Sequence, residues 1–391
     1  MKIAYLLYGS LKLWLAKIIT LFTSGDVWLV CEKPNEARDN GLYFFKYCME
    51  IQHNHKVFYV VTRNSYDMKN ISNFSDNIII KNSLKHCILY FKASKLISSQ
   101  ALPFPYSEKM CKIIFRVRNQ KYFWLQHGIT KDKLNHEDMD YSVKEYSLVC
   151  CASPREAVFF QEEFGYPSLN AIYTGFCRFD GLIDNSSTHQ QILVMPTFRK
   201  WLSTKSKSST PDLEEEDKFK KSLFFSSYSN LLKDKKLIDY LKSNNIQLVF
   251  YLHYAFQPYR YLFDECICDN ITIASPLDYD VQQLLKESKM LITDYSSVFF
   301  DFAYMKKPEL FFQFDKNEYR KNHYKEGYFS YEKDGFGPIL TDEKSVVDYI
   351  IAISQSKYQI EDCYIKRIDS FFPIVDIENC FRIYNLIENQ I

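Results

Sequence analysis

Short apolar runs alternate with segments in which apolar residues recur every three or four positions. Helical patterns of this kind cover residues 40–50 and 83–93. The apolar runs between such patterns read as buried strands, and in the first half of the chain they cover 27–31, 56–61, 77–81, 95–99, 122–126 and 146–150. Apolar strands that are separated by helices are typical of a parallel sheet covered on both faces.

The alternation pauses near residues 174–184 and restarts with the apolar run at 191–196. Further strands are predicted at 247–253, 271–275, 290–294 and 309–314. The sequence therefore predicts an α/β protein with two Rossmann-like domains that face each other across a cleft, residues 1–185 and residues 186–391. Residues 363–391 should be mostly helical, and C-terminal helices of this fold class can cross back to the first domain.

Two segments depart from the alternation. Residues 203–217 are polar and low in complexity, which predicts a mobile surface loop directly after the PTFRKW motif. Near residues 10–22, one helical face gathers apolar side chains, with Lys12 and Lys17 off it; the face consists of Leu11, Trp14, Leu15, Ile18 and Ile19. This pattern fits a membrane-interface helix and an amphipathic helix packed on its own domain equally well.

Composition narrows the classes of function. Lys and Arg number 49 against 48 Asp and Glu, so no overall field attracts nucleic acid. The 11 cysteines are irregularly spaced and form no zinc-ligand pattern, which favours reduced thiols over a structural metal. Lysines interrupt the apolar N-terminus, and it has no small-residue cleavage site, which argues against a signal peptide and a spanning helix.

The segment MLITDYSSVFFD, residues 290–301, carries the first candidate site. An apolar strand ends there, and a Tyr-Ser-Ser sequence then opens a helix. The hydroxyls of Ser296 and Ser297, together with backbone N–H groups, form a possible anion site, and Asp301 is placed two turns into the helix within range of a ribose. For this segment alone, a plain helix cap is the simpler interpretation.

Three further strand ends carry candidate chemistry. His253 ends the strand at 247–253, and His127 ends another strand immediately before Gly128. Arg199 lies in the loop after the strand at 191–196, where a guanidinium can bind phosphate through two hydrogen bonds. One histidine at a strand end is usually structural, but two of them, together with an arginine and an anion site, favour catalysis.

Several segments together resemble the CDP-glycerol:poly(glycerophosphate) glycerophosphotransferase family of teichoic-acid and capsule synthesis. They cover nearly the whole chain in order: EKPNEARDNGLYFFKY (32–47), LISSQ (96–100), WLQHGITKD (124–132), YTGFCRFDGL (173–182), MPTFRKW (195–201), YLHY (251–254), LITDYSSVFFDF (291–302), KKPELFFQFD (306–315) and GPIL (337–340). This family is similar to two-Rossmann glycosyltransferases of the GT-B type, which agrees with the strand pattern.

The resemblance implies roles for these residues. Ser296 and Ser297, with Thr293 beside them, would bind the donor's diphosphate, and Asp301 would bind its ribose. The loop 275–280, which includes Pro276, would contact the base.

The resemblance also implies the catalytic groups. His127, in the acceptor-side N-terminal domain, would be the general base. His253 and Arg199 would stabilise the phosphoryl group or the leaving CMP, and the two histidine roles are interchangeable at this stage.

The reaction so implied is transfer of glycerol phosphate from CDP-glycerol to a lipid-linked or polymer acceptor, at the cytoplasmic face of a bacterial membrane. CDP-ribitol as donor, a nucleotide-sugar glycosyltransferase and a non-catalytic scaffold are the alternatives. No metal site is predicted, because the Asp278–Asp280 segment reads as a cap of the helix that follows it. A loosely bound divalent ion stays open.

Overall fold

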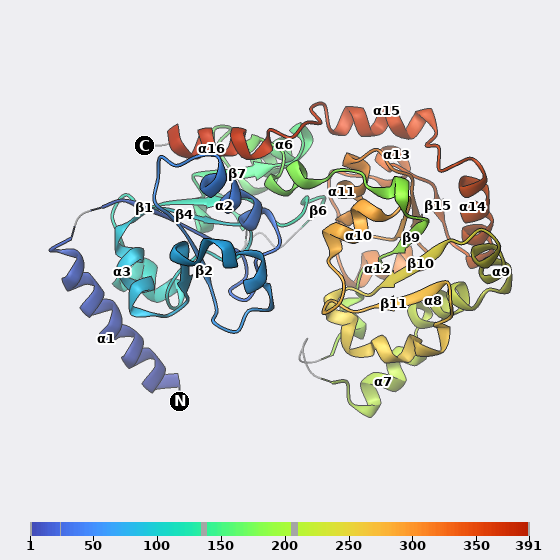
Figure 1. Cartoon of the computed structure of the whole chain (residues 1–391), viewed down its shortest axis with the longest axis horizontal. Coiled ribbons are helices and arrows are strands. Elements are labelled where there is room, and N and C mark those ends of the chain that lie inside the picture. The colour runs from blue at the N-terminus through green and yellow to red at the C-terminus, as the bar shows by residue number, and fades with distance from the viewer. Residues whose placement is uncertain (1, 24, 134–138, 205–209, 390–391) are drawn as a thin grey trace. The chain divides into compact units, whose positions relative to one another are not determined.

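The computed structural model describes residues 2–23, 25–133, 139–204 and 210–389. It divides into two compact units (Figure 1). The first contains residues 1–129, 135–181 and 376–391, and the second contains residues 130–134 and 182–375.

The first unit is built on a parallel sheet in the order β3-β2-β1-β4-β5-β7-β8. Its strands are β1 (Val27–Cys31), β2 (Val57–Val61), β3 (Ile78–Ile80), β4 (Ala93–Ser98), β5 (Lys121–Trp124), β7 (Leu148–Cys151) and β8 (Ala171–Tyr173). Trp28 and Val30 on β1 are fully buried, as a central strand with helices on both faces requires.

The helices of the first unit include one from the far end of the chain. They are α1 (Lys2–Thr20), α2 (Asn40–Glu50), α3 (Leu84–Lys92), α5 (Tyr141–Lys144), α6 (Pro154–Phe164) and α16 (Asn379–Asn389), with the short turns η1 (Tyr66–Asn70), η2 (Ser72–Asn77), η3 (Met110–Ile114) and η4 (Cys177–Gly181). The Asp180 carboxylate accepts hydrogen bonds from the backbone N–H of Asn379 at 2.9 Å and of Cys380 at 2.8 Å. This contact fixes the start of α16, which packs on α2 and η4.

The second unit repeats the strand order of the first. Its parallel sheet runs β11-β10-β9-β12-β13-β15. The strands are β9 (Gln191–Val194), β10 (Gln247–Tyr251), β11 (Ile271–Ala274), β12 (Met290–Thr293), β13 (Glu309–Phe312) and β15 (Ile339–Leu340). A small antiparallel pair joins β6 (Asp132–Lys133) to β14 (Lys325–Glu326).

The helices of the second unit cover its sheet around an aromatic core that includes Phe224, Phe250 and Phe312. They are α7 (Leu213–Lys220), α8 (Leu223–Lys233), α9 (Lys235–Ser243), α10 (Val281–Glu287), α11 (Val298–Tyr304), α12 (Lys316–Asn322), α13 (Tyr331–Asp334), α14 (Glu343–Gln355) and α15 (Asp362–Phe371). The short turns are η5 (Ser186–Thr188), η6 (Lys200–Leu202) and η7 (Tyr254–Cys266).

The predicted fold class, α/β with two Rossmann-like units, is confirmed. In both sheets the chain reverses direction across the sheet, between β1 and β4 in one and between β9 and β12 in the other. Ligands of open parallel sheets bind outside the carboxyl ends of the strands at this reversal point. The fold therefore directs attention to the loops that follow β1, β4, β9 and β12.

The prediction of a loop over 203–217 is wrong at its C-terminal end, since α7 already begins at Leu213. The Asp212 carboxylate accepts the Glu215 N–H at 2.9 Å, and the Glu215 carboxylate accepts the Asp212 N–H at 3.1 Å. This reciprocal cap satisfies two backbone donors and starts a helix within a strongly acidic segment. Residues 205–209 of the predicted loop lie outside the described residues.

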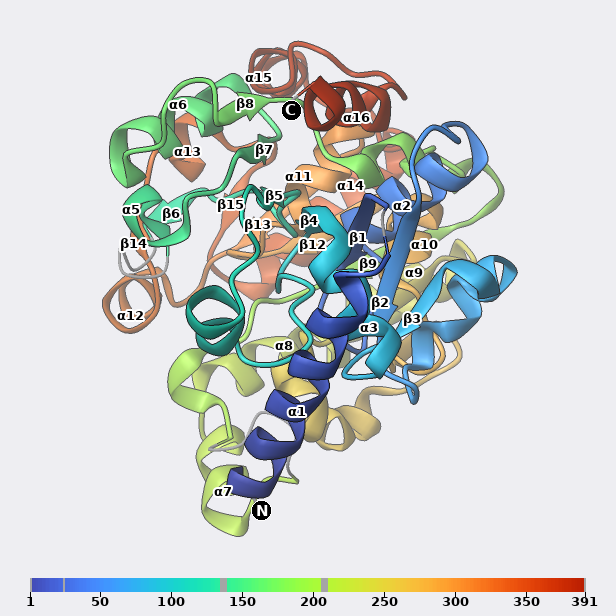
Figure 2. The ribbon, with the colours of Figure 1, turned by 90° about the vertical axis from the view of Figure 1, so that its left-hand side faces the viewer.

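Helix α1 has one packed face and one exposed apolar face. Leu13 and Ala16 are fully buried, and the Trp14 ring contacts Phe115 edge-on at 5.5 Å. Figures 1 and 2 show α1 lying against α3. The opposite face exposes 46–68% of each of its large apolar residues, which are Leu7, Leu11, Trp14, Leu15 and Ile18. Within the described part of the chain, no helix combines the length and apolar character needed to cross a bilayer.

Candidate functional site

In the second unit, the loops after β9 and β12 are tied together at the reversal point of the sheet. One oxygen of the Asp294 carboxylate accepts the backbone N–H groups of Thr197 at 2.8 Å and Tyr295 at 2.5 Å. The Thr293 hydroxyl donates to the Met195 carbonyl at 2.7 Å. These bonds fix the path of the backbone on both sides of the crevice.

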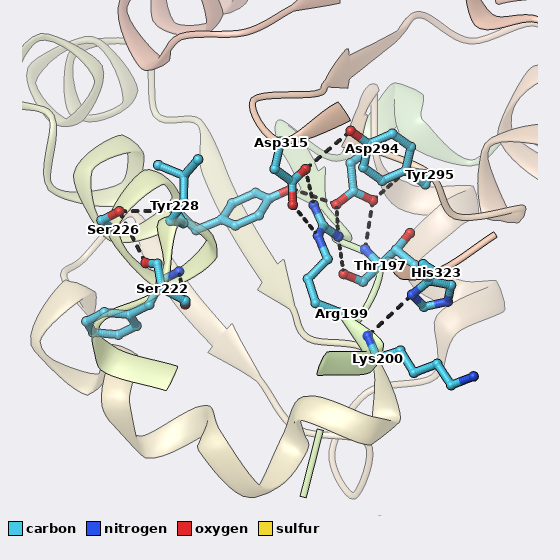
Figure 3. A network of polar contacts seen from close by, with 12 residues as sticks. Thr197, Arg199, Lys200, Ser222, Ser226, Tyr228, Asp294, Tyr295, Asp315 and His323 are labelled. Atoms are coloured by element: carbon cyan, nitrogen blue, oxygen red, sulfur yellow. Dashed lines mark hydrogen bonds and ion pairs between the residues drawn. The ribbon is translucent and has the colours of Figure 1, made fainter. Parts of the chain in front are cut away.

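Arg199 lies beneath these loops and is fully buried. Its guanidinium donates to Asp315 at 2.6 and 3.0 Å, to Asp294 at 2.8 Å and to the Thr197 carbonyl at 2.6 Å (Figure 3). Burial alone would lower the pKa of Arg199, but the two carboxylates outweigh it and raise the pKa above its ordinary value. All three guanidinium nitrogens donate to protein oxygens. Arg199 therefore connects two loops, in place of the phosphate contact that was expected.

The other predicted phosphate contacts differ in their exposure. Thr293 is fully buried and its hydroxyl is used within the fold, so the structure does not present it to a ligand. Ser296 and Ser297 are half-buried. The Ser296 hydroxyl accepts the Val298 N–H at 3.3 Å, whereas Ser297 is the N-cap of α11 without a side-chain cap hydrogen bond. Of these three residues, Ser297 is the best placed to meet a phosphate oxygen.

The predicted ribose and base contacts lie on neighbouring elements. Asp301 is buried within the first turn of α11, not two turns in as expected, because the helix begins only at Val298. Pro276 is half-buried in the turn after β11. The Asp280 carboxylate accepts the Gln283 N–H at 3.0 Å and caps α10, which confirms the predicted helix cap. Among the described residues, no three His, Cys, Asp or Glu side chains form a potential metal site.

His253 follows β10 and lies against the loop after β9. Its ring stacks on Phe198 with the centroids 4.6 Å apart and the planes at 22°. The Ala255 N–H donates to its Nδ1 at 3.2 Å. Because Nδ1 is the acceptor, the neutral imidazole carries its proton on Nε2. His253 is thereby arranged as a hydrogen-bond donor.

In the first unit, His127 follows β5. Its side chain has an exposed face, yet dense surroundings make desolvation the main cause that lowers its pKa to about 4; the Arg178 and Lys33 cations add to this. A hydrogen bond to the Ser99 backbone acts in the other direction. The low pKa keeps the His127 imidazole neutral at physiological pH, so the ring can accept a proton.

Hydrogen bonds from Asn40 and Arg178 hold the backbone at His127. The Asn40 amide donates to the Gln126 carbonyl at 2.7 Å, and Arg178 donates to the His127 carbonyl at 3.3 Å and to Asp39 at 3.0 Å. Gln126 has a φ of 57°, a left-handed conformation that non-glycine residues adopt only when their surroundings enforce it. Asn40 and Arg178 therefore position His127, and sequence reasoning missed both.

Glu32 secures the start of α2, the helix that carries Asn40. Its carboxylate accepts the backbone N–H groups of Arg38, Asp39 and Leu42, each at 2.8 Å. Glu32 itself is fully buried at the end of β1. A carboxylate at this position satisfies donors that the first turn of a helix leaves unpaired. The only sequence signal was the acidic residue directly after an apolar strand.

Comparisons with known proteins match this architecture. The family model described as CDP-Glycerol:Poly(glycerophosphate) glycerophosphotransferase matches residues 14–389. The chain is 33% identical over 377 residues to the minor teichoic acid biosynthesis protein GgaB of Bacillus subtilis (strain 168), a match that covers 95% of this chain and 40% of GgaB. It is 28% identical over 256 residues to the teichoic acid poly(ribitol-phosphate) polymerase of Bacillus spizizenii, covering 58% of this chain and 34% of that protein.

A solved structure shares the fold. It is a histidine variant of the wall teichoic acid polymerase TagF that was soaked with CDPG, and it superposes with a TM-score of 0.66 at 19% identity over 93% of this chain and 88% of that chain. The present chain thus spans less than half the length of GgaB and most of the TagF chain. Since the family model covers nearly every residue, this chain belongs to the CDP-glycerol:poly(glycerophosphate) glycerophosphotransferase family.

Proposed function

We propose that the chain transfers glycerol phosphate from CDP-glycerol to a hydroxyl of a membrane-linked acceptor. The acceptor oxygen attacks the β-phosphorus and forms a new P–O bond. The bond between that phosphorus and the bridging oxygen breaks, and CMP leaves with the bonding electron pair. The proton of the acceptor hydroxyl passes to His127.

Two histidines that follow parallel strands, His127 after β5 and His253 after β10, carry this proposal. The low pKa of His127 keeps its ring neutral at physiological pH, so it can accept a proton. His253 accepts the Ala255 N–H at Nδ1, so its neutral ring carries the proton on Nε2. Phosphoryl transfer needs a group that takes up the proton of the nucleophile and a group that stabilises charge on phosphoryl oxygens. We therefore assign the base role to His127 and the charge-stabilising role to His253.

The donor nucleotide is assigned to the crevice of the second unit. In this proposal Ser296 and Ser297 bind the diphosphate, Asp301 binds the ribose, and the turn at Pro276 contacts the base. His253 enters the same crevice from β10. Arg199 holds the loops in place without touching the nucleotide, because its nitrogens are already bonded to protein oxygens.

The test is CMP release from CDP-glycerol and from CDP-ribitol, each with a set of lipid-linked acceptors. Release that depends on an acceptor, with phosphate recovered in the product, is expected. CDP-ribitol is the second candidate donor because a ribitol-phosphate polymerase is among the relatives. A product that gains a sugar but no phosphate would instead indicate a nucleotide-sugar glycosyltransferase, and no release from any donor would leave the scaffold alternative.

The acceptor's membrane link suggests a role for α1. Its exposed apolar face lies next to Lys12 and Lys17, whose ammonium groups sit over the rings of Tyr8 at 4.4 Å and Trp14 at 5.4 Å. Apolar side chains flanked by cations suit the interface of an anionic bilayer. We infer that α1 docks the protein peripherally on the cytoplasmic leaflet. Cosedimentation with anionic vesicles should fall sharply when Leu11 and Ile18 are replaced by Ser, and unchanged cosedimentation would contradict this role.

A further inference from the structure

A third histidine, which the sequence did not single out, lies against the loop after β9 in the second unit. His323 follows the last residue of α12, and its ring stacks on Tyr319 with centroids 4.7 Å apart and planes at 13°. It also meets Phe198 edge-on at 4.7 Å. Phe198 is the same ring on which His253 stacks, so the two histidines contact one aromatic side chain.

The hydrogen bonding of His323 fixes where its proton lies. The backbone N–H of Lys200 donates to its Nδ1 at 3.3 Å (Figure 3). A neutral imidazole that accepts at Nδ1 carries its hydrogen on Nε2. Burial is the largest cause that lowers the pKa of His323 to about 4, followed by the Arg199 and Lys200 cations, so the ring is neutral at physiological pH.

The Nε2–H of His323 is a donor without an acceptor. Within the described residues, this nitrogen is buried and has no hydrogen-bond partner. The hydroxyl oxygen of Thr197, directly before Phe198, is also buried without a hydrogen-bond partner among the described residues. Buried polar groups in native proteins are almost always satisfied, so an unmet donor beside a ligand crevice indicates that a ligand supplies the acceptor.

The chemistry of that acceptor follows from the surroundings. The Lys200 ammonium and the Arg199 guanidinium both act on the His323 ring, and their effect on its pKa exceeds that of Asp132 and Asp294. An N–H donor bonds more strongly to an anionic oxygen than to a neutral one. A diphosphate offers such oxygens, and in the proposed function it lies in this crevice.

We propose that His323 donates its Nε2–H to a diphosphate oxygen of the donor nucleotide and acts beside His253 as a second binding histidine. The identification of the anion as a diphosphate rests on the proposed function. The unsatisfied Nε2–H of His323 does not depend on it. His323 would share the developing charge with His253 and accept no proton. This role differs from that of His127, which takes up a proton in the proposed function.

The first test is nitrogen-15 NMR of the histidine rings of the full chain, titrated with inorganic pyrophosphate and then with CDP. The His323 signals are identified by their loss in His323→Phe, which keeps an aromatic ring between Phe198 and Tyr319. The Nε2–H signal should shift on addition of either anion. His189, half-exposed and paired with Glu287 on the same unit, serves as the reference ring whose signals should not move.

The second test compares binding of CDP with binding of cytidine. His323→Phe should weaken CDP binding about ten- to a hundredfold and leave cytidine binding unchanged, because only the hydrogen bond to a charged oxygen is lost. His323→Gln, whose amide can place a donor near the Nε2 position, should lose less than His323→Phe. His189→Asn is the matched control and should bind both ligands like wild type.

The outcomes separate this proposal from the proposed function. The role of His323 is overturned if a folded His323→Phe binds CDP like wild type, or if the Nε2–H signal does not shift with pyrophosphate. Either result counts even if the enzyme releases CMP. If wild type binds no CDP but the Nε2 signal shifts with pyrophosphate, the anion donor stands and the nucleotide assignment fails. If the Phe variant does not fold, the Gln variant and the wild-type titration decide.

Discussion

The two units have the same strand order but support their reversal-point loops in different ways. Under His127, the neutral amide of Asn40 and the buried guanidinium of Arg178 hold backbone carbonyls, and Arg178 also pairs with Asp39. Under the loops of the second unit, Arg199 and its two carboxylates form a fully buried ion cluster. In the proposed function, one unit presents the base, and the other holds the loops that bind the nucleotide.

The difference has an energetic consequence. A buried ion cluster is tolerated only while every charge is paired, so removing one member leaves an uncompensated charge in the core. Loss of the Asn40 amide would leave only neutral backbone carbonyls unsatisfied, which costs less than an unpaired buried charge. We therefore expect changes in the first unit to affect catalysis more than stability and changes around Arg199 to affect stability first.

The sharpest way to test the catalytic half of this comparison is His127→Ala. Turnover should fall by about a hundred- to ten-thousandfold, the usual contribution of a positioned general base. His127→Asn should be no better, since an amide does not accept a full proton. CMP release under saturating CDP-glycerol is the measurement, with the affinity for CDP-glycerol expected to stay the same. His189→Ala is the control, and near-normal turnover of His127→Ala would leave His253 as the candidate base.

The stability half is tested by Arg199→Met, which keeps the volume but leaves Asp294 and Asp315 buried and unpaired. The free energy of unfolding should drop by about 3–5 kcal/mol, as for other buried pairs that lose one partner. Denaturant titration of the variant and wild type measures this. Lys221→Met, in an exposed pair with Asp217, should leave the unfolding midpoint almost unchanged. An Arg199→Met protein as stable as wild type would show that the cluster does not brace the loops.

The strands were predictable because few structures other than a buried strand suit a short apolar run of four or more residues. The strand at 27–31 appears where the pattern placed it, whereas the strand predicted at 247–253 ends at Tyr251. Strand β15 has two residues, Ile339 and Leu340, and carries no periodic signal, so the pattern missed it. The helix over 213–220 was missed because polarity was weighed above the reciprocal cap between Asp212 and Glu215.

The site was predictable only in part, because its contacts join distant residues. Strand ends identified His127 and His253, but nothing local shows that Arg199 meets Asp315, 116 positions further on. The same holds for His323, whose partner Lys200 lies 123 positions earlier. Residue type and strand position therefore suggest which side chains can react with or bind a ligand. Burial and pairing decide whether such a side chain contacts the ligand or supports the loops.

A smaller effect is expected at the helix start that follows β12. Ser297→Ala should weaken binding of CDP-glycerol by about ten- to a hundredfold, the value of one hydrogen bond to a charged phosphate. Stability should hardly change, because the Ser297 hydroxyl makes no cap bond. Calorimetry with CDP-glycerol measures the affinity, and exposed Ser243→Ala is the control. If Ser297→Ala binds as tightly as wild type, the phosphate lies elsewhere in the crevice.

The smallest effect should appear in the pH dependence of the first unit. The pKa of His127 is lowered to about 4, so the base stays neutral above that pH and activity should be lost only as the pH falls through about 4. Lys33 contributes to this lowering through its positive charge. Lys33→Met should therefore raise the pKa and move the acid limb of kcat/KM upward, by about a tenth to half of a pH unit for a half-exposed charge.

Lys33→Arg keeps the charge and should keep the acid limb at its wild-type position, which separates electrostatics from loss of packing. The profile of kcat/KM is the right measurement, because it reports groups of the free enzyme. An acid limb near pH 6.5 in wild type would mean that the titrating base is an ordinary solvated histidine. An acid limb near pH 4 that shifts in Lys33→Met and not in Lys33→Arg would assign the titrating group to His127, since Lys33 acts on that ring through charge alone.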